Sequence, residues 1–195
     1  MPVDVEKVKA FIKVPNAKTY IEVGVYTGKG ITNVANAFPT LETILGVDSY
    51  KAYVDEFLNY GQGPDTTQTK AYTDSNYIVS EKQSKYNRLL AGNRISECVH
   101  KDKIQLLEQD SIEAAKLISD GTVDIVFLDA YTNIPRAHED VKAWYPKVAN
   151  GGILSGQSWH PTISIVPEIR IALDAIGCST EIQTDGIFWY IQKEA

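Results

Sequence analysis

Four acidic residues lie at or near the ends of short apolar runs in this chain, and this pattern suits the binding of a small polar molecule. They are Glu22, Asp48, Asp110 and Asp129. The apolar runs are typical of buried parallel strands, whose carboxyl ends meet at one edge of a sheet and bind ligands there. One acid at a strand end would be commonplace, whereas four in series favour a binding site over solvated loop residues.

Two glycines mark the turn at the first of these strand ends. The stretch Tyr20–Gly30 predicts a strand, a turn that contains Gly24 and Gly28, and a helix whose apolar positions recur at three and four residues. Glycine permits backbone conformations closed to other residues, and a helix N-terminus presents free N–H groups at the same place. The stretch therefore predicts a pocket of the nucleotide-binding type.

The spacing of this turn excludes the common phosphate-binding loops. A P-loop needs four residues between its glycines and a hydroxyl residue after the lysine, whereas here Gly24 and Gly28 are one residue too close and Gly30 follows Lys29. The dinucleotide fingerprint fails because Asn33 stands where a small residue is required. The carboxylate of Glu22 would repel a diphosphate and is better matched to a cationic ligand.

Strands and helices alternate along the chain, which predicts an α/β, Rossmann-like, doubly wound sheet with helices on both faces. The pair Asp185–Gly186 signals a terminal hairpin, so the last of seven strands should run antiparallel to its neighbour. The expected strands are 20–23, 43–47, 104–107, 123–128, 151–156, 180–183 and 187–191, and the expected helices begin at about 5, 31, 111, 136 and 167. The length of 195 residues predicts one domain, 1–195.

Composition favours a small-molecule substrate over nucleic acid. The formal net charge is -6, so the chain lacks the basic surface that binds phosphate backbones. Two cysteines are too few for a disulfide framework in a chain of this length. No apolar run reaches membrane-spanning length. We therefore expect a cytoplasmic protein without a membrane partner.

Taken in order, these motifs resemble those of the class I S-adenosylmethionine-dependent methyltransferases. The first motif of that family has an acid, one residue, a glycine, three residues and a second glycine, which matches the stretch from Glu22 to Gly28. The resemblance continues through Asp48, Gln109–Ser111, Phe127–Ala130 and Asn150–Leu154 and leaves out about 50–103. The order of the motifs is more specific than any one of them.

The resemblance implies S-adenosylmethionine as the cofactor, bound by the residues that match the motifs. The glycine turn would hold the methionine part, with Glu22 near its ammonium group. Asp48 would accept hydrogen bonds from both ribose hydroxyls, Asp110 would take the adenine amine, and Asp129 would lie by the sulfonium and the substrate. The other implied contacts are Gly24, Val25, Tyr26, Thr27, Gly28, Ser49, Ser111 and Ala130.

Within the family, the chain looks most like the macrocin-type small-molecule O-methyltransferases, many of which hold magnesium with acids after the fourth and fifth strands. Asp129 is present, but Ser158 stands where a second acid is expected, and one carboxylate is a poor site for a hard cation. We therefore expect no tightly bound metal. A side chain must then take the proton of the acceptor, and His160 and Tyr131 are the candidates.

The connection at about 50–103 is far longer than an ordinary strand-to-strand link. Tyr50, Tyr53 and Phe57 recur at helical spacing, as do Tyr86 and Leu89, so part of it should be a helix packed on the sheet. Its aromatic residues suit a lid over the cofactor or a homodimer contact, and the lid is favoured.

These observations predict methyl transfer from S-adenosylmethionine to a small molecule, with a hydroxyl oxygen as the favoured acceptor. A nucleic-acid methyltransferase is disfavoured by the acidic balance. It is also disfavoured because the residues after Asp129 lack the Pro-Pro-aromatic run of enzymes that methylate base amino groups. A module that binds S-adenosylmethionine without methyl transfer stays open, because the metal-binding acids are missing.

Overall fold

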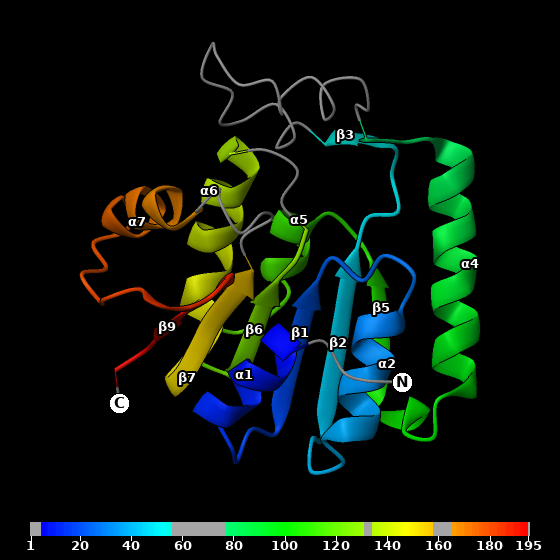
Figure 1. Cartoon of the computed structure of the whole chain (residues 1–195), viewed down its shortest axis with the longest axis horizontal. Helices are drawn as coiled ribbons and strands as arrows, with labels where there is room; N and C mark the ends of the chain where they lie inside the picture. Colours follow the sequence, from blue (N-terminus) through cyan, green and yellow to red (C-terminus); the bar gives the residue numbers. More distant parts are fainter. Residues whose placement is uncertain (1–4, 56–76, 131–133, 158–164, 195) are drawn as a thin grey trace.

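The computed structural model describes residues 5–55, 77–130, 134–157 and 165–194, and every structural statement below concerns these residues. Its centre is a seven-stranded sheet in the order β5-β2-β1-β6-β7-β9-β8 (Figure 1). The strands are β1 (Thr19–Val23), β2 (Thr43–Asp48), β5 (Ile104–Glu108), β6 (Val123–Leu128), β7 (Val148–Gln157), β8 (Gln183–Asp185) and β9 (Phe188–Gln192). The first five are parallel, whereas β9 runs antiparallel to both β7 and β8. The Rossmann-like sheet with an antiparallel last strand is thus confirmed.

Helices cover both faces of this sheet (Figure 1), because alternate residues of each strand point to opposite sides. In β1, Ile21 and Val23 belong to one buried cluster and Tyr20 to the other. The helices α1 (Val5–Lys13), α2 (Lys29–Ala37) and α4 (Glu81–Glu97) pack on the Tyr20 side. The opposite face is covered by α5 (Ser111–Ala115), α6 (Ile134–Trp144) and α7 (Val166–Asp174).

The strand order reverses beside β1, which creates a crevice at the carboxyl ends of β1 and β6. After β1 the chain moves outward to β2 and β5, and it then returns to the other side of β1 as β6. Backbone pairing continues one residue past the strands, since Gly24 N donates to Val47 O at 2.8 Å and Asp129 N donates to Val23 O at 2.8 Å. Ligands of doubly wound sheets bind at this kind of switch point.

The connection after β2 differs from the sequence-based expectation. Tyr53 begins β3 (Tyr53–Asp55), which pairs with β4 (Tyr77–Val79) in a separate two-stranded sheet, so the helix predicted from its spacing is wrong there. The predicted helix further along exists as α4, but Tyr86 and Leu89 are exposed. Its buried side is small and polar, with Ser84, Asn87 and Ala91. Phe57 lies outside the described residues, so neither the lid nor the dimer contact is tested.

Two further differences are local. The helix that begins at 111 is short and ends at Ala115, because Leu117 N and Ile118 N bond to carbonyls three residues back in a tighter turn. Two short 3-10 helices, η2 (Lys101–Lys103) and η3 (Tyr145–Lys147), precede β5 and β7. In the described part of the chain, no helix combines the length and apolarity that crossing a membrane requires.

Candidate functional site

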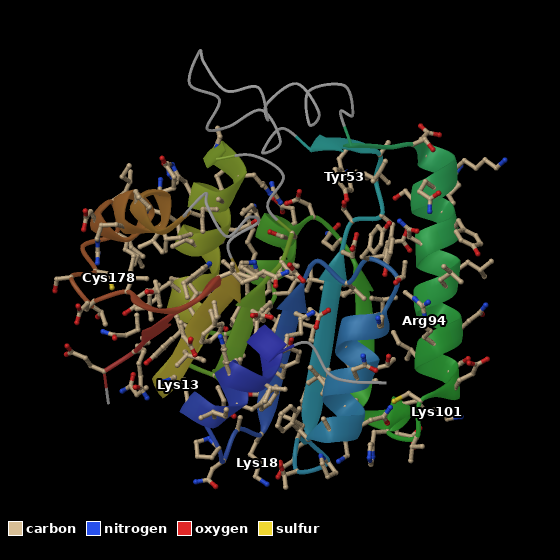
Figure 2. All side chains as sticks on the ribbon, in the orientation of Figure 1. Lys13, Lys18, Tyr53, Arg94, Lys101 and Cys178 are labelled. Carbon is tan, nitrogen blue, oxygen red and sulfur yellow. The ribbon has the colours of Figure 1, made fainter. Side chains whose placement is uncertain are left out.

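A cavity of about 760 Å³ lies at the carboxyl ends of the parallel strands. In Figure 2, Tyr53, one of its lining residues, stands beyond this edge of the sheet, and Lys18 lies at the opposite edge. Eight of the twelve predicted cofactor contacts line it: Gly24, Tyr26, Asp48, Ser49, Asp110, Ser111, Asp129 and Ala130. The other four, Glu22, Val25, Thr27 and Gly28, do not line it.

At Gly24 the first turn lies close to the end of β6. Its φ is +98°, a conformation that favours glycine, and a Cβ built on it would lie 2.5 Å from the carbonyl oxygen of Asp129. Tyr26 is also in the left-handed region, at φ 53°, and its N–H points to Asp48. The turn therefore brings the main chain of Gly24 close to the end of β6 at the cavity.

Gly28 has a packing role instead. Its φ is +77°, and a Cβ there would lie 2.8 Å from Cα of Ala91 in α4. The neighbouring Thr27 carbonyl accepts a hydrogen bond from Arg94 of α4 at 2.6 Å, and Figure 2 shows Arg94 on the side of α4 that faces the sheet. Val25 is buried in the core. This second half of the motif thus docks α4 on the start of α2.

Asp48 ends β2 with a carboxylate that two backbone groups hold in place. Tyr26 N donates to its Oδ2 and Tyr50 N donates to its Oδ1, each at 2.8 Å. Burial raises the pKa of Asp48 above its usual range, against the lowering effect of these N–H groups. Each carboxylate oxygen has a second acceptor position, so both can still accept a hydroxyl donor from a ligand.

Asp110 caps α5 and also pairs with α6. Its Oδ1 accepts the N–H of Ile112 at 2.9 Å, and its Oδ2 accepts a charged hydrogen bond from Arg136 at 2.8 Å. Burial alone would raise the pKa of Asp110, but Arg136 and the N–H groups outweigh it and hold that pKa below its usual value. Asp110 is thus the N-cap of α5, and Glu113 pairs with Lys116 at 2.6 Å.

Asp140 of α6 lies behind this pair and is 1% exposed. Ser111 donates a hydrogen bond to its Oδ1, and Arg136 lies 3.6 Å away. Its Oδ2 has no hydrogen-bond partner among the described residues. Burial raises the pKa of Asp140 to about 6, partly offset by Ser111 and Arg136.

We expect Asp140→Asn to stabilise the protein at neutral pH. The folded state binds this proton with a pKa of about 6 against 3.8 ordinarily, so ionisation removes stability as pH rises from about 4 to 6. The asparagine avoids this cost, which amounts to about 2 kcal/mol above pH 6. Denaturant unfolding at pH 4.5 and 7.5 measures the gain. Asp174→Asn, an exposed control on α7, should change stability equally at both values; a pH-independent effect of Asp140→Asn would refute this account.

Asp129 follows β6 and is held from two sides. The side-chain amide of Gln157, at the end of β7, donates to its Oδ1 at 2.7 Å. The ammonium group of Lys7, from α1, lies 3.5 Å from its Oδ2. Asp129 is therefore a carboxylate held in place at the cavity wall and paired with the ammonium group of Lys7.

Glu22 does not face the cavity as the motif led us to expect. It is 1% exposed, its Oε2 lies 3.1 Å from Nζ of Lys7, and the hydroxyl of Tyr20 donates to the same oxygen at 2.9 Å. The spacing of the motif could not show this, because Lys7 comes from a helix that precedes the strand. A contact between Glu22 and a cofactor ammonium group stays a prediction; in this structure the Glu22 carboxylate is bound by Lys7 and Tyr20.

Several lining residues were not predicted from the sequence. Gln157 carries a readable signal, since it is a polar residue at the end of an apolar strand, like the four acids. Other polar lining residues come from helices, where no motif marks them: Ser84, Asn87, Arg136 and Glu139. Tyr50 and Tyr53 of the long connection also line the cavity. The two candidate bases, Tyr131 and His160, lie outside the described residues.

Comparison with known proteins gives one family and several structures of similar fold. A family model described as a methyltransferase domain matches residues 21–159. The calicheamicin methyltransferase CalS11 is similar at 13% identity and a TM-score of 0.62, over 96% of this chain and 77% of that one. The O-methyltransferase NovP is similar at 17% identity and a TM-score of 0.60, over 98% of this chain and 78% of that one. Spermidine synthase from Thermotoga maritima shares the fold at 13% identity and a TM-score of 0.52, over 95% and 56%. No curated protein sequence matched the chain.

Proposed function

Because the chain belongs to the S-adenosylmethionine-dependent methyltransferases, we propose that its cavity binds this cofactor and directs its methyl group to a hydroxyl oxygen of a small molecule. One observation carries the proposal. The carboxylate of Asp48, fixed by two backbone N–H groups, stands beside the Gly24 turn at the switch point of the sheet. A paired hydroxyl donor, as on a ribose, matches a carboxylate with one oxygen available to each hydroxyl.

Each of the other motif residues in the cavity wall would contact one part of the cofactor, as the matching residues do in the family. Main chain at Gly24 and Tyr26 would hold the methionine part. Asp110 and Ser111 would lie at the adenine, where the carboxylate that Arg136 keeps ionised can also accept an amine hydrogen. Asp129 and Ala130 would lie at the sulfonium. Tyr50 and Tyr53 add aromatic surface to the wall between these ends.

In methyl transfer the main task of the protein is to position the acceptor hydroxyl against the methyl group of the cofactor. The cofactor supplies a methyl group that the positive sulfur already activates. Asp129, bound by Gln157 and paired with Lys7, would offer a fixed negative charge near this group. Tyr131 and His160 remain our candidates for the base that accepts the hydroxyl proton of the substrate.

The acceptor class rests on family likeness. CalS11 is named a TDP-rhamnose 3'-O-methyltransferase and NovP an O-methyltransferase. These neighbours support a small molecule as the acceptor, and from the sequence motifs we propose that the chain is an O-methyltransferase of the macrocin type. The experiment is a screen of hydroxyl-bearing small molecules, such as sugar nucleotides and phenols, for formation of S-adenosylhomocysteine. Turnover that requires an acceptor supports the proposal. Cofactor binding without turnover on any acceptor would favour a binding module, and turnover on nucleic acid alone would contradict the proposal.

We also expect the reaction to be independent of a divalent metal. The two oxygens of Asp129 face an amide N–H and an ammonium group, which are donors and not metal ligands. No cluster of three or more potential ligands occurs within the described ranges. Turnover of the acceptor found in the screen should be unchanged by EDTA, with a magnesium-dependent methyltransferase as the positive control. Activity lost with EDTA and restored by magnesium would contradict this expectation.

A further inference from the structure

Lys7 is a buried lysine that joins the two acids of the cofactor motifs. It comes from α1, which precedes the first motif, and its side chain is 4% exposed. Its ammonium group lies 3.1 Å from Oε2 of Glu22 and 3.5 Å from Oδ2 of Asp129. It also stands 5.2 Å from the ring centroid of Phe127, so it is enclosed by protein on several sides. A buried cation in this position binds the two carboxylates together.

The surroundings are shaped for this ion pair. A Cβ at Gly30 would lie 2.4 Å from Nζ of Lys7 and 2.7 Å from Oε1 of Glu22, so the start of α2 leaves room for both groups. The titratable groups of the described residues around the ammonium are Glu22 and Tyr20 of β1 and Asp129 after β6. From β7, the neutral Gln157 reaches the cluster through Asp129. Counted over the described residues alone, the cluster therefore holds two carboxylates and one ammonium group, a balance of minus one.

This balance matches the ligand that the proposed function places there. S-Adenosylmethionine has an ammonium group, a sulfonium and a carboxylate, so its amino-acid part carries one net positive charge. S-Adenosylhomocysteine lacks the sulfonium charge and is neutral there. Of the cluster, Asp129 lines the cavity, and Lys7 with Glu22 lies directly behind it.

We propose that Lys7 is a positioning residue of the cofactor site, whose ammonium group pairs with both Glu22 and Asp129 and fixes Asp129 at the sulfonium end of the cavity. This inference rests on the proposed function. Without the lysine, the buried carboxylate of Glu22 and the half-buried carboxylate of Asp129 repel each other, which favours uptake of a proton by the pair. Binding of the cationic cofactor would then require that proton to leave.

The test compares Lys7→Met with the double variant Lys7→Met/Glu22→Gln and with Lys9→Met. The double variant restores the charge balance of minus one. Lys9 is the matched control, because it lies on the same helix but binds Asp185, 3.3 Å away, and does not line the cavity. Titration calorimetry with S-adenosylmethionine and S-adenosylhomocysteine at pH 6.5 and 8.5, in buffers of different ionisation enthalpy, gives affinity and proton release. Thermal unfolding reports the fold.

Lys7→Met should bind S-adenosylmethionine about ten-fold more weakly at pH 6.5 than at pH 8.5 and release a proton on binding. Its affinity for S-adenosylhomocysteine should depend less on pH. The double variant should melt at a higher temperature than Lys7→Met and lose the proton release, and Lys9→Met should match the wild type in both titrations.

Two results would overturn the inference while leaving the proposed function intact. One is binding by Lys7→Met at wild-type affinity at both pH values without proton release. The other is a double variant that is no more stable than Lys7→Met. Failure of the wild-type protein to bind S-adenosylmethionine would instead overturn the proposed function, and the inference with it.

Discussion

Replacing Gly24 by alanine should abolish measurable cofactor binding and lower the free energy of unfolding by about 3 kcal/mol. The backbone at φ +98° is strained for alanine, and the added Cβ would lie 2.5 Å and 2.7 Å from the carbonyl oxygen and carbon of Asp129. These are main-chain atoms at the end of a central strand and cannot rotate away. The end of β6 must therefore shift, and Asp129 moves with it. Denaturant unfolding and calorimetry with S-adenosylmethionine measure the two effects.

Two other glycines separate the causes. Gly121 has a φ of +70° and nothing within 4 Å of a built Cβ. Gly121→Ala should therefore lower the free energy of unfolding through backbone strain alone and keep cofactor affinity. Gly92 lies inside α4 with open space around it, so Gly92→Ala should stabilise the protein by about 0.5–1 kcal/mol through helix propensity. If Gly24→Ala lost no more stability than Gly121→Ala and bound the cofactor, the close approach would have no functional role.

Asp48→Asn should weaken S-adenosylmethionine binding about 100-fold, the loss expected for two charge-assisted hydrogen bonds worth about 1.5 kcal/mol each. Both Tyr26 and Tyr50 donate a backbone N–H to this side chain. An asparagine has one acceptor oxygen, so its NH₂ group must face one of these donors and the side chain turns. The ribose hydroxyls then lose their paired acceptor. Calorimetry on the folded variant gives the affinity.

Asp124→Asn is the matched control for this variant. Asp124 is also a carboxylate that accepts backbone N–H groups, from Lys18 at 2.7 Å and Thr19 at 2.9 Å. It lies at the opposite edge of the sheet, where Figure 2 shows Lys18. The control should lose stability but keep cofactor affinity. Equal losses of affinity in both variants would mean that Asp48 acts through the fold and not through the ligand.

The fold was predictable from the sequence wherever a strand is short, apolar and bounded by polar residues. The run 123–128 matches β6 residue for residue, because all its side chains except that of Asp124 are apolar, as a strand buried on both faces requires. The strand ends were predictable for the same reason, and so were the acids that line the cavity there. The connection after β2 was not, since α4 buries Ser84 and Asn87 and exposes Tyr86 and Leu89, the reverse of an ordinary amphipathic helix.

The partner of Glu22 shows what a motif cannot reveal. The first motif gives the carboxylate and the glycines but not the distant residue that neutralises the carboxylate. Lys7 sits in a helix whose pattern predicts simple packing, and only the fold brings its ammonium group between β1 and β6. The packing of Gly28 against Ala91 was also not predictable from the motif, because it depends on how α4 docks on the start of α2.

The most direct test of the central claim, that this cavity is a site for S-adenosylmethionine, is calorimetric titration of the full chain with S-adenosylmethionine and, separately, with NAD. We predict binding of one molecule of S-adenosylmethionine per chain, in the micromolar range, and no heat of binding with NAD. Absence of S-adenosylmethionine binding by the folded protein, or tighter binding of NAD, would contradict the account.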